Sequence, residues 1–347
     1  MRQHPVPALI LFLSLLGACG GEDEASIADD VPSLLRARDF SGVALVLRGE
    51  ETLLAETLGF ADRSAQITHT LDTRFRIGSM TKAFTALAVI QLVEEGLIGF
   101  DTPVSKLFPD YPRGDEITVH HLLTHRSGLP DYLGAVDERD AHTPEELVGA
   151  IEDAPLLFSP GTAFSYSNTN YAALGIIVET LTGQPWSRAV ADRILLPYGL
   201  EQTGFGADPI EGEGFAKGYF EGQPARAIDM SVPYAAGAMD SSAKDLVRWA
   251  RLWMSGELFG PEVSTRALPE PPPREGVNSV GYGWFVLDEG GVRIHHHGGD
   301  IAGFTSLVAL VPEQEGVIIV LMNREGQGAL RNELLEAIVN AYFARAR

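Results

Sequence analysis

The sequence predicts an α+β protein in which one antiparallel sheet is built from both ends of the chain, flanked by helices and interrupted by a mostly helical region. Strand patterns occur within 33–99 and again within 226–347, whereas 100–225 alternates helical patterns with Pro- and Gly-containing loops. The hydrophobic content of 45% over 347 residues is high enough for a large core, in one domain or in two intimately joined ones.

The N-terminus predicts export. Arg2 is followed by an apolar run over 6–16 that is short for the alternative, a membrane span, and small residues lead to the only cysteine, Cys19. The segment LGAC (16–19) resembles the lipobox of bacterial lipoproteins, which implies a signal peptide over 1–18 and a lipid on Cys19. Ordinary cleavage that leaves a free thiol is the alternative. We therefore expect an exported bacterial lipoprotein, anchored in a membrane and located in the periplasm or at the cell surface.

The charge balance excludes one class of partner. Lys and Arg together number 26 against 47 Asp and Glu, which gives a formal net charge of -21. Because binding to nucleic-acid phosphates needs a basic surface, we expect no nucleic-acid partner. Residues 19–32 are small and acidic, which predicts a solvated tether between the lipid and the domain, itself predicted at 33–347.

The first elements of the domain are predicted to be a hairpin and a buried helix. The stretches 40–50 and 51–62 carry branched apolar residues bounded by glycines, and they predict two strands joined by a tight turn. Residues 79–95 are apolar on most faces, which predicts a buried helix, and Gly96 is placed to end it.

Helices dominate the next part, and strands return near the end. Helical patterns occur at 143–153 and 170–183, Ser242 with Asp245 predicts a capped helix start, and the Pro-rich segment 268–275 predicts a surface loop. Four strands and a closing amphipathic helix are predicted at 280–288, 291–297, 304–312, 316–323 and 328–347.

The stretch FRIGSMTKAFTAL (75–87) places Lys82 three residues after Ser79, near the start of the buried helix. Side chains at i and i+3 share one helix face, so the amine can reach the hydroxyl and take its proton, which a serine nucleophile needs. The free N–H groups of a helix start also favour negative charge there. On spacing alone, a serine that caps the helix remains the alternative, and the chain holds a second S-x-x-K at Ser241 and Lys244.

A second polar element, Tyr166-Ser167-Asn168, precedes the helix predicted at 170–183. A tyrosine and an amide on a loop can relay a proton and hydrogen-bond a substrate carbonyl or amide. The alternative is an ordinary turn whose serine or asparagine caps the helix.

The third element is the strand at 291–297, which ends in three histidines and runs into Gly298 and Gly299. Glycines let a ligand approach a strand backbone closely. Three histidines also suggest a metal, but strand alternation puts only His295 and His297 on one side, and no acidic or Cys partner stands at ligand spacing.

Two further patterns carry less chemistry. His121 and His125 lack the Glu of H-E-x-x-H, so a structural turn is the better interpretation of that stretch. An alpha/beta-hydrolase needs a G-x-S-x-G elbow, and no serine in the sequence has glycines at both flanking positions.

The motifs S-M-T-K, Y-S-N and H-G-G, in this order, resemble the serine beta-lactamase and penicillin-recognising peptidase superfamily. More narrowly, they are similar to the group of class C beta-lactamases, D-Ala-D-Ala carboxypeptidases and related esterases. The resemblance covers about residues 35 to 345 and includes ITVHHLLTHRSGLPDY (117–132) and AAGAMDSSAKDLVRWARLW (235–253). It implies a beta-lactamase/transpeptidase-like fold with no cofactor and no metal, and it makes Ser241 and Lys244 incidental.

The resemblance also implies roles for the residues of the three motifs. Ser79 is the implied acylated nucleophile, and Lys82 and Tyr166 share the proton transfers, with the choice of base left open. The backbone N–H groups of Ser79 and Asp300 are the implied oxyanion hole. The implied substrate-binding residues are Asn168, His297 and Gly299.

One position departs from the family's pattern, because beta-lactamases usually carry K-T-G where this chain has His297-Gly298-Gly299. The lysine charge and the threonine hydroxyl would bind a beta-lactam carboxylate, and both are replaced. We therefore expect inefficient antibiotic hydrolysis and better activity on esters or D-amino-acid peptides.

Together these inferences predict an exported serine hydrolase that acts through an acyl-enzyme. The expected substrate is a small molecule or peptide with an ester or amide bond, of the D-amino-acid peptide or beta-lactam kind. The alternative is a non-hydrolytic protein that binds or senses penicillin or cell-wall peptides. The presence of all three motifs favours the enzyme.

Overall fold

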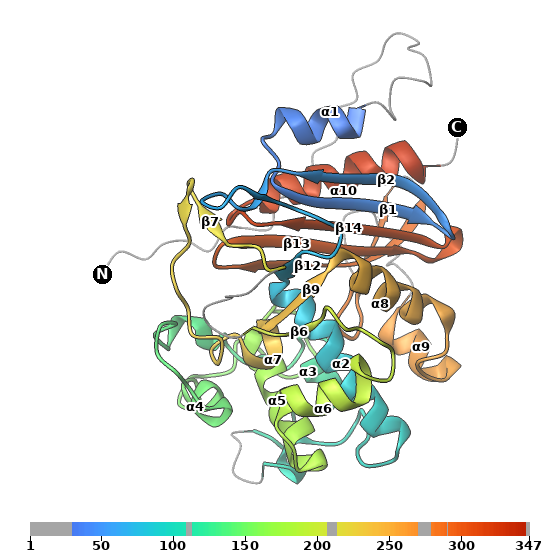
Figure 1. The fold of residues 1–347 in the computed structure, drawn as a ribbon. Coiled ribbons are helices and arrows are strands. Elements are labelled where there is room, and N and C mark those ends of the chain that lie inside the picture. Colours follow the sequence, from blue (N-terminus) through green and yellow to red (C-terminus); the bar gives the residue numbers. More distant parts are fainter. Residues whose placement is uncertain (1–29, 109–112, 207–213, 270–278, 290, 345–347) are drawn as a thin grey trace.

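The computed structural model describes residues 30–108, 113–206, 214–269, 279–289 and 291–344 (Figure 1). The predicted signal peptide, Cys19 and most of the predicted tether lie outside the described residues, as does most of the Pro-rich segment. Within the described ranges, no helix combines the length and the apolar character that spanning a bilayer requires.

The largest sheet has seven strands, and its order confirms that both ends of the chain build it. From edge to edge the strands are β10 (Ser279–Val280), β11 (Phe285–Glu289), β12 (Val292–Ile301), β13 (Phe304–Val311), β14 (Gly316–Met322), β1 (Gly42–Arg48) and β2 (Glu51–Leu58). All neighbours are antiparallel. The N-terminal hairpin thus pairs with the last strand (Figure 1).

Both faces of the sheet are covered, which explains why its central strands are nearly continuous apolar runs. Every residue of β13 and β14 is buried. Alternate side chains enter two cores: Val46 packs in the core that includes α1 (Asp30–Ala37) and α10 (Gly328–Tyr342), whereas Leu45 and Ile319 pack in the larger core towards the other helices. Figure 1 shows α1 and α10 together on one side of the sheet.

The other elements lie mainly between β2 and β10 in the chain. The α-helices are α2 (Thr81–Glu94), α3 (Val119–Leu123), α4 (Pro144–Gly149), α5 (Asn168–Thr182), α6 (Trp186–Val190), α7 (Tyr234–Gly237), α8 (Ala243–Ser255) and α9 (Pro261–Ala267). The short strands are β3 (Phe60–Asp62), β4 (Ile67–Thr68), β5 (Arg74–Arg76), β6 (Gly204–Phe205), β7 (Tyr219–Phe220), β8 (Gln223–Pro224) and β9 (Met239–Ser242). Shorter helical turns are η1 (Gly78–Met80), η2 (Val104–Lys106), η3 (Tyr132–Gly134), η4 (Ala191–Leu195) and η5 (Pro312–Gln314).

The helix predicted at 79–95 forms as the 3-10 turn η1 followed by α2. It is buried on nearly all sides, because α5, α6 and α7 pack around it and β12 lies against η1. Gly96 follows with a φ of +74°, a left-handed conformation in which glycine carries little steric cost. The turn η1 therefore stands where the large sheet meets the helical region (Figure 1).

The N-terminal boundary differs from the prediction. The helix α1 begins at Asp30, and its residues Val31 and Leu35 lie one turn apart and are buried against the sheet. The last residues of the segment 19–32 therefore belong to the folded domain, because their apolar side chains complete the smaller core.

Two strand boundaries also differ. The strand predicted at 280–288 is divided into β10 and β11, since Tyr282 and Trp284 turn into the core and Gly283 between them has a φ of +80°. The strand predicted at 291–297 continues to Ile301, so the two glycines that follow the histidines lie inside β12.

Candidate active site

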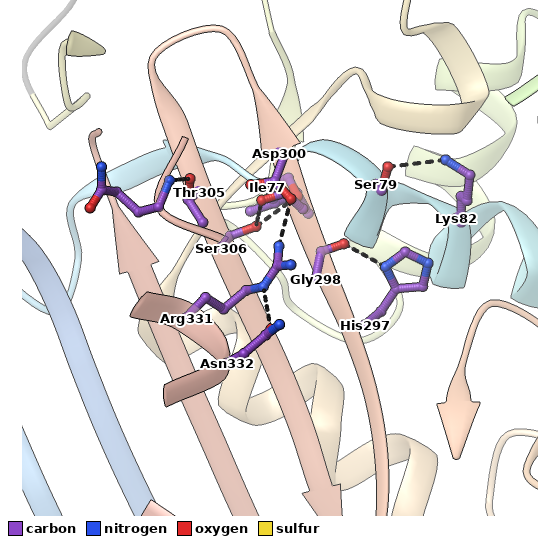
Figure 2. Close-up of polar contacts among 12 residues, drawn as sticks. Ile77, Ser79, Lys82, His297, Gly298, Asp300, Thr305, Ser306, Arg331 and Asn332 are labelled. Atoms are coloured by element: carbon purple, nitrogen blue, oxygen red, sulfur yellow. Dashed lines mark hydrogen bonds and ion pairs between the residues drawn. The ribbon is translucent and has the colours of Figure 1, made fainter. Parts of the chain in front are cut away.

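Ser79 and Lys82 lie together at the junction of the sheet and the helical region. Ser79 is the middle residue of η1, and Lys82 is the second residue of α2. The Lys82 Nζ is 3.2 Å from the Ser79 Oγ (Figure 2). Ser79 does not cap the helix, because Met80 holds the N-cap position. It lines a pocket of about 380 Å³, so the hydroxyl has both an amine neighbour and a cavity that a substrate can enter.

Lys82 is fully buried, and its acceptors decide how the amine is oriented. Nζ donates to Asn168 Oδ1 and to the backbone carbonyl of Ala236, both at 2.8 Å. Burial lowers the pKa of Lys82 to about 7, although the negative charge of Asp131 partly opposes this shift. A neutral amine has two N–H bonds and one lone pair. Because the two acceptors take both hydrogens, the lone pair is left facing the Ser79 hydroxyl.

Tyr166 joins this pair. Its ring centroid is 4.8 Å from the Lys82 Nζ. Burial raises the pKa of Tyr166 above its usual range, and the nearby Ser79 hydroxyl offsets only part of that shift. At neutral pH the phenol keeps its proton and can donate it, whereas Lys82 can accept one. The structure thus brings the three predicted groups together.

His125 supports the Tyr166 ring, and sequence reasoning missed it. The two rings stack with centroids 4.4 Å apart, and His125 Nδ1 accepts a hydrogen bond from the Ser167 backbone N–H at 3.2 Å. Burial, together with the charge of Lys82, holds the pKa of His125 well below its usual range. The turn predicted at this residue is present, with a φ of +55°, but no spacing pattern shows that its ring faces Tyr166.

Asp131 is the second residue that sequence reasoning missed. Its Oδ2 accepts from the backbone N–H of Asn168 at 3.0 Å and from Asn168 Nδ2 at 2.8 Å. Asn168 is the first residue of α5, and the hydroxyl of Ser167 before it donates to the Pro130 carbonyl instead of capping the helix. Asn168 also lines the pocket, and its second Nδ2 hydrogen can still meet a substrate.

The strand β12 lies directly against the turn that carries Ser79. A Cβ added at Gly299 would stand 1.9 Å from the carbonyl oxygen of Ile77. Ser306, the β13 partner of Gly299, donates to that same carbonyl at 2.9 Å (Figure 2). These contacts hold the backbone segments of Ser79 and Asp300 side by side, which is where the oxyanion hole is predicted.

His297 lies on the same strand as a neutral ring. Its Nδ1 is 2.6 Å from the Gly298 carbonyl oxygen, and its centroid is 5.3 Å from that of Phe285. Burial and the nearby Lys82 lower the pKa of His297 to about 3, so it carries no charge at neutral pH. Among the predicted site residues, Asn168 and Asp300 line the pocket. His297 and Gly299 were also predicted to bind substrate, but they are not among the residues that line it.

The other histidines and the second S-x-x-K do not form a comparable site. Among the described residues, no group of three or more His, Cys, Asp or Glu side chains could hold a metal ion. Ser241 hydrogen-bonds with Thr203 at 2.8 Å, and Lys244 pairs with Asp72 at 2.7 Å. Ser241 and Lys244 therefore use different partners and do not act as a pair.

The profile of the beta-lactamase family matches residues 27–343, which spans the sheet, the helical region and all three motifs. The chain belongs to the beta-lactamase family. This membership, together with hydrolytic relatives of the same fold, makes the chain a serine hydrolase. The predicted fold class and the predicted class of enzyme are confirmed.

Several known proteins are similar to this chain over most of its length. Esterase EstB of Burkholderia gladioli is 32% identical over 384 residues, with 93% of this chain and 97% of that protein covered. Penicillin-binding protein 4 of Amycolatopsis lactamdurans is 29% identical over 329 residues, covering 88% and 86%. The structure of D-amino acid amidase from Ochrobactrum anthropi, complexed with L-phenylalanine amide, has a TM-score of 0.80 at 28% identity and covers 92% and 98% of the two chains.

Within the beta-lactamase family, the departure at H-G-G has a structural counterpart in Arg331. The Arg331 Nη1 pairs with the Asp300 carboxylate at 2.6 Å (Figure 2). A Cβ added at Gly298 would stand 2.6 Å from that same nitrogen, so a threonine there would displace the guanidinium. Where K-T-G would supply an ammonium and a hydroxyl, this chain has a neutral imidazole and a guanidinium that already has a carboxylate partner.

Proposed function

We propose that this chain is an exported, lipid-anchored serine hydrolase that cleaves esters or D-amino-acid amides and peptides through an acyl-enzyme on Ser79. The observation that carries the proposal is the Lys82 amine, which lies 3.2 Å from the Ser79 Oγ at the edge of the pocket. Burial lowers its pKa to about 7, so a large fraction of the amine is neutral at neutral pH. A hydroxyl with such a neighbour can be deprotonated as it attacks.

The proposed reaction has two halves. Lys82 takes the Ser79 proton while Oγ attacks the substrate carbonyl, and the backbone N–H groups of Ser79 and Asp300 receive the negative charge that forms on the carbonyl oxygen. Collapse breaks the ester or amide bond, and the leaving group takes a proton through Lys82 or Tyr166. Water then attacks the acylated serine, the acid product leaves, and Ser79 regains its proton.

Among the proposed substrates, the charges around the site favour esters and amides over D-Ala-D-Ala peptides, whose terminal carboxylate lies beside the scissile bond. His297 is neutral at neutral pH, Arg331 is paired with Asp300, and Arg226, on the pocket wall, is paired with Glu138 at 2.6 Å. The carboxylates of Asp300 and Glu138 partly neutralise these two guanidinium groups, which weakens the attraction that either would exert on a substrate carboxylate. Relatives named as an esterase and as a D-amino acid amidase support the same choice.

Export and anchoring are proposed on the N-terminal sequence alone. The apolar run, the LGAC segment and the acidic stretch after Cys19 support them. Fractionation of cells that produce the full chain tests this part separately from the chemistry.

A substrate panel tests the chemistry. The purified enzyme is incubated with short p-nitrophenyl esters, D-amino acid amides, D-Ala-D-Ala peptides and nitrocefin, and an active-site phosphonate is used to label it. We expect ester or amide turnover, poor nitrocefin hydrolysis, and loss of both labelling and turnover in Ser79→Ala. Labelling that survives in Ser79→Ala contradicts the assignment, and stoichiometric acylation without product release favours the binding or sensing alternative.

A further inference from the structure

We infer that Asp131 is a positioning residue that fixes the orientation of the Asn168 amide and, through it, the direction in which the Lys82 lone pair points. The inference rests on the proposed roles of Ser79 and Lys82. It concerns a residue that lies outside the motifs S-M-T-K, Y-S-N and H-G-G and that makes no hydrogen bond to Ser79 or Lys82.

The first step is the orientation of the amide. A carboxylate only accepts hydrogen bonds, so Asp131 must face the NH₂ end of the Asn168 side chain, as it does at 2.8 Å. The opposite end, Oδ1, then faces the Lys82 Nζ at 2.8 Å. A flipped amide would set its oxygen against the carboxylate and its NH₂ against the amine. Asp131 thus selects the orientation in which Lys82 meets an acceptor.

The second step is what this acceptor does for the amine. With Asn168 Oδ1 and the Ala236 carbonyl both accepting, neutral Lys82 has committed both of its hydrogens, and its lone pair faces Ser79. If Asn168 presented NH₂ instead, the lone pair would be drawn towards that donor and away from the hydroxyl. The general base would then hold its proton-accepting orbital in the wrong direction.

The third step is that Asp131 is itself fixed. Its Oδ1 accepts from the Leu133 backbone N–H at 3.0 Å, which makes it the N-cap of η3. The carbonyl of Pro130, one residue earlier, accepts from the hydroxyls of Ser167 and Thr169 at 3.0 and 2.7 Å. The segment that carries the carboxylate is therefore tied to the start of α5, the helix that carries Asn168.

Asp131 also supplies the negative charge in the surroundings of Lys82. The ionisable groups that face the amine are Asp131, His125, Tyr166, Tyr171 of α5 and His297 of β12. Burial keeps both imidazoles and both phenols uncharged at neutral pH. Removing the Asp131 charge should therefore make Lys82 harder to protonate.

The test compares Asp131→Asn with Asp131→Glu and with the control Asp137→Asn, whose exposed carboxylate pairs with Arg139. We expect Asp131→Asn to lower kcat for ester hydrolysis roughly 10- to 100-fold, within the ~10²–10⁴-fold that a positioned general base contributes, with little change in KM. In the pH profile of kcat for Asp131→Asn, the fall in rate on the acidic side should occur at lower pH than in the wild type. Asp131→Glu keeps the charge, so in this variant the acidic fall should stay near the pH of the wild type while kcat itself decreases, and Asp137→Asn should match the wild type.

A second readout is independent of turnover. The sequence holds four lysines, so the ¹³Cε signals of labelled lysine can be followed by NMR, and the one that titrates near pH 7 should move to lower pH in Asp131→Asn. A loss of kcat with neither shift would mean a purely structural role and would overturn the inference, as would an unchanged kcat. If the wild type shows no Ser79-dependent hydrolysis, the proposed function fails instead, and the NMR titration still decides whether Asp131 acts on Lys82.

Discussion

At the scale of single residues, the behaviour of Lys82 follows from the neutrality of its hydrogen-bond partners. These partners are a hydroxyl, an amide oxygen and a peptide carbonyl. A carboxylate in contact would stabilise the ammonium, whereas burial beside neutral acceptors lowers the pKa to about 7. Lys244 of the second S-x-x-K shows the contrast, because its side chain is exposed and pairs with Asp72. Burial, and not the motif alone, separates the two lysines.

The first prediction concerns the pH dependence. Because the proposed mechanism uses the neutral Lys82 amine to accept the Ser79 proton, kcat/KM for an ester should fall as the pH decreases through about 7 and should level off above it. Lys82→Arg keeps a positive charge that cannot be removed in this range and should lower kcat/KM by roughly 10²-fold or more. The measurement is a pH profile of p-nitrophenyl ester hydrolysis. Lys244→Gln is the matched control and should leave the profile unchanged, whereas a rate that is flat down to pH 5 contradicts the assignment of Lys82 as base.

Single residues also show what sequence can predict about a site. Ser79 and Lys82 are three positions apart on a helix start, so their meeting follows from local geometry. The role of Tyr166 could be predicted only from the order of the three motifs, that is, from the resemblance to a known family. Asp131 reaches Asn168 across 37 positions, and no local pattern marks a carboxylate for such a contact.

At the scale of elements, the site depends on how closely η1 and β12 approach each other. Gly299 leaves space for the Ile77 carbonyl, and the Ser306 hydroxyl on β13 satisfies that carbonyl. The sequence shows two glycines after the histidines, and from them it predicts that another group approaches the strand backbone closely. The sequence does not predict what approaches Gly299. In the structure it is the backbone of the turn before Ser79, and that contact joins distant parts of the chain, so it depends on the complete sheet.

The second prediction tests this approach. Gly299→Ala places a Cβ 1.9 Å from a backbone oxygen, so β12 must move away from η1 and the two predicted oxyanion donors must separate. Loss of such a donor costs roughly 10²–10³-fold in kcat, and the overpacking should lower the free energy of unfolding by about 1–3 kcal/mol. Ester kinetics and denaturant unfolding measure the two effects. The control is Gly149→Ala, at an exposed helical position with no atom within 4 Å of the added Cβ, and it should leave kcat unchanged.

At the scale of the whole molecule, the large sheet lies between two hydrophobic cores, and only one of them adjoins the candidate active site. One core, which holds α1 and α10, lies on one face, and the core that surrounds Ser79 and Lys82 lies on the other. The order of the segments, with strand patterns at both ends of the chain and helical patterns between them, predicted one sheet flanked by helices. It did not predict which helices cover which face of the sheet. The start of α1 was missed because Val31 and Leu35 follow an acidic stretch, and their burial depends on α10 at the far end of the chain.

The last prediction uses this separation. Leu35 is completely buried in the smaller core, so Leu35→Ala should lower the free energy of unfolding by about 2–5 kcal/mol through lost burial and an unfilled cavity. Leu196→Ala removes the same atoms from a side chain that is 69% exposed, so the free energy of unfolding should change by no more than about 0.5 kcal/mol. Because the sheet stands between Leu35 and the site, kcat and KM measured well below the melting temperature should equal those of the wild type in both variants. A fall in kcat in the folded Leu35→Ala enzyme would mean that the smaller core sets the position of β12, and the two faces of the sheet would then have to be treated as one coupled unit.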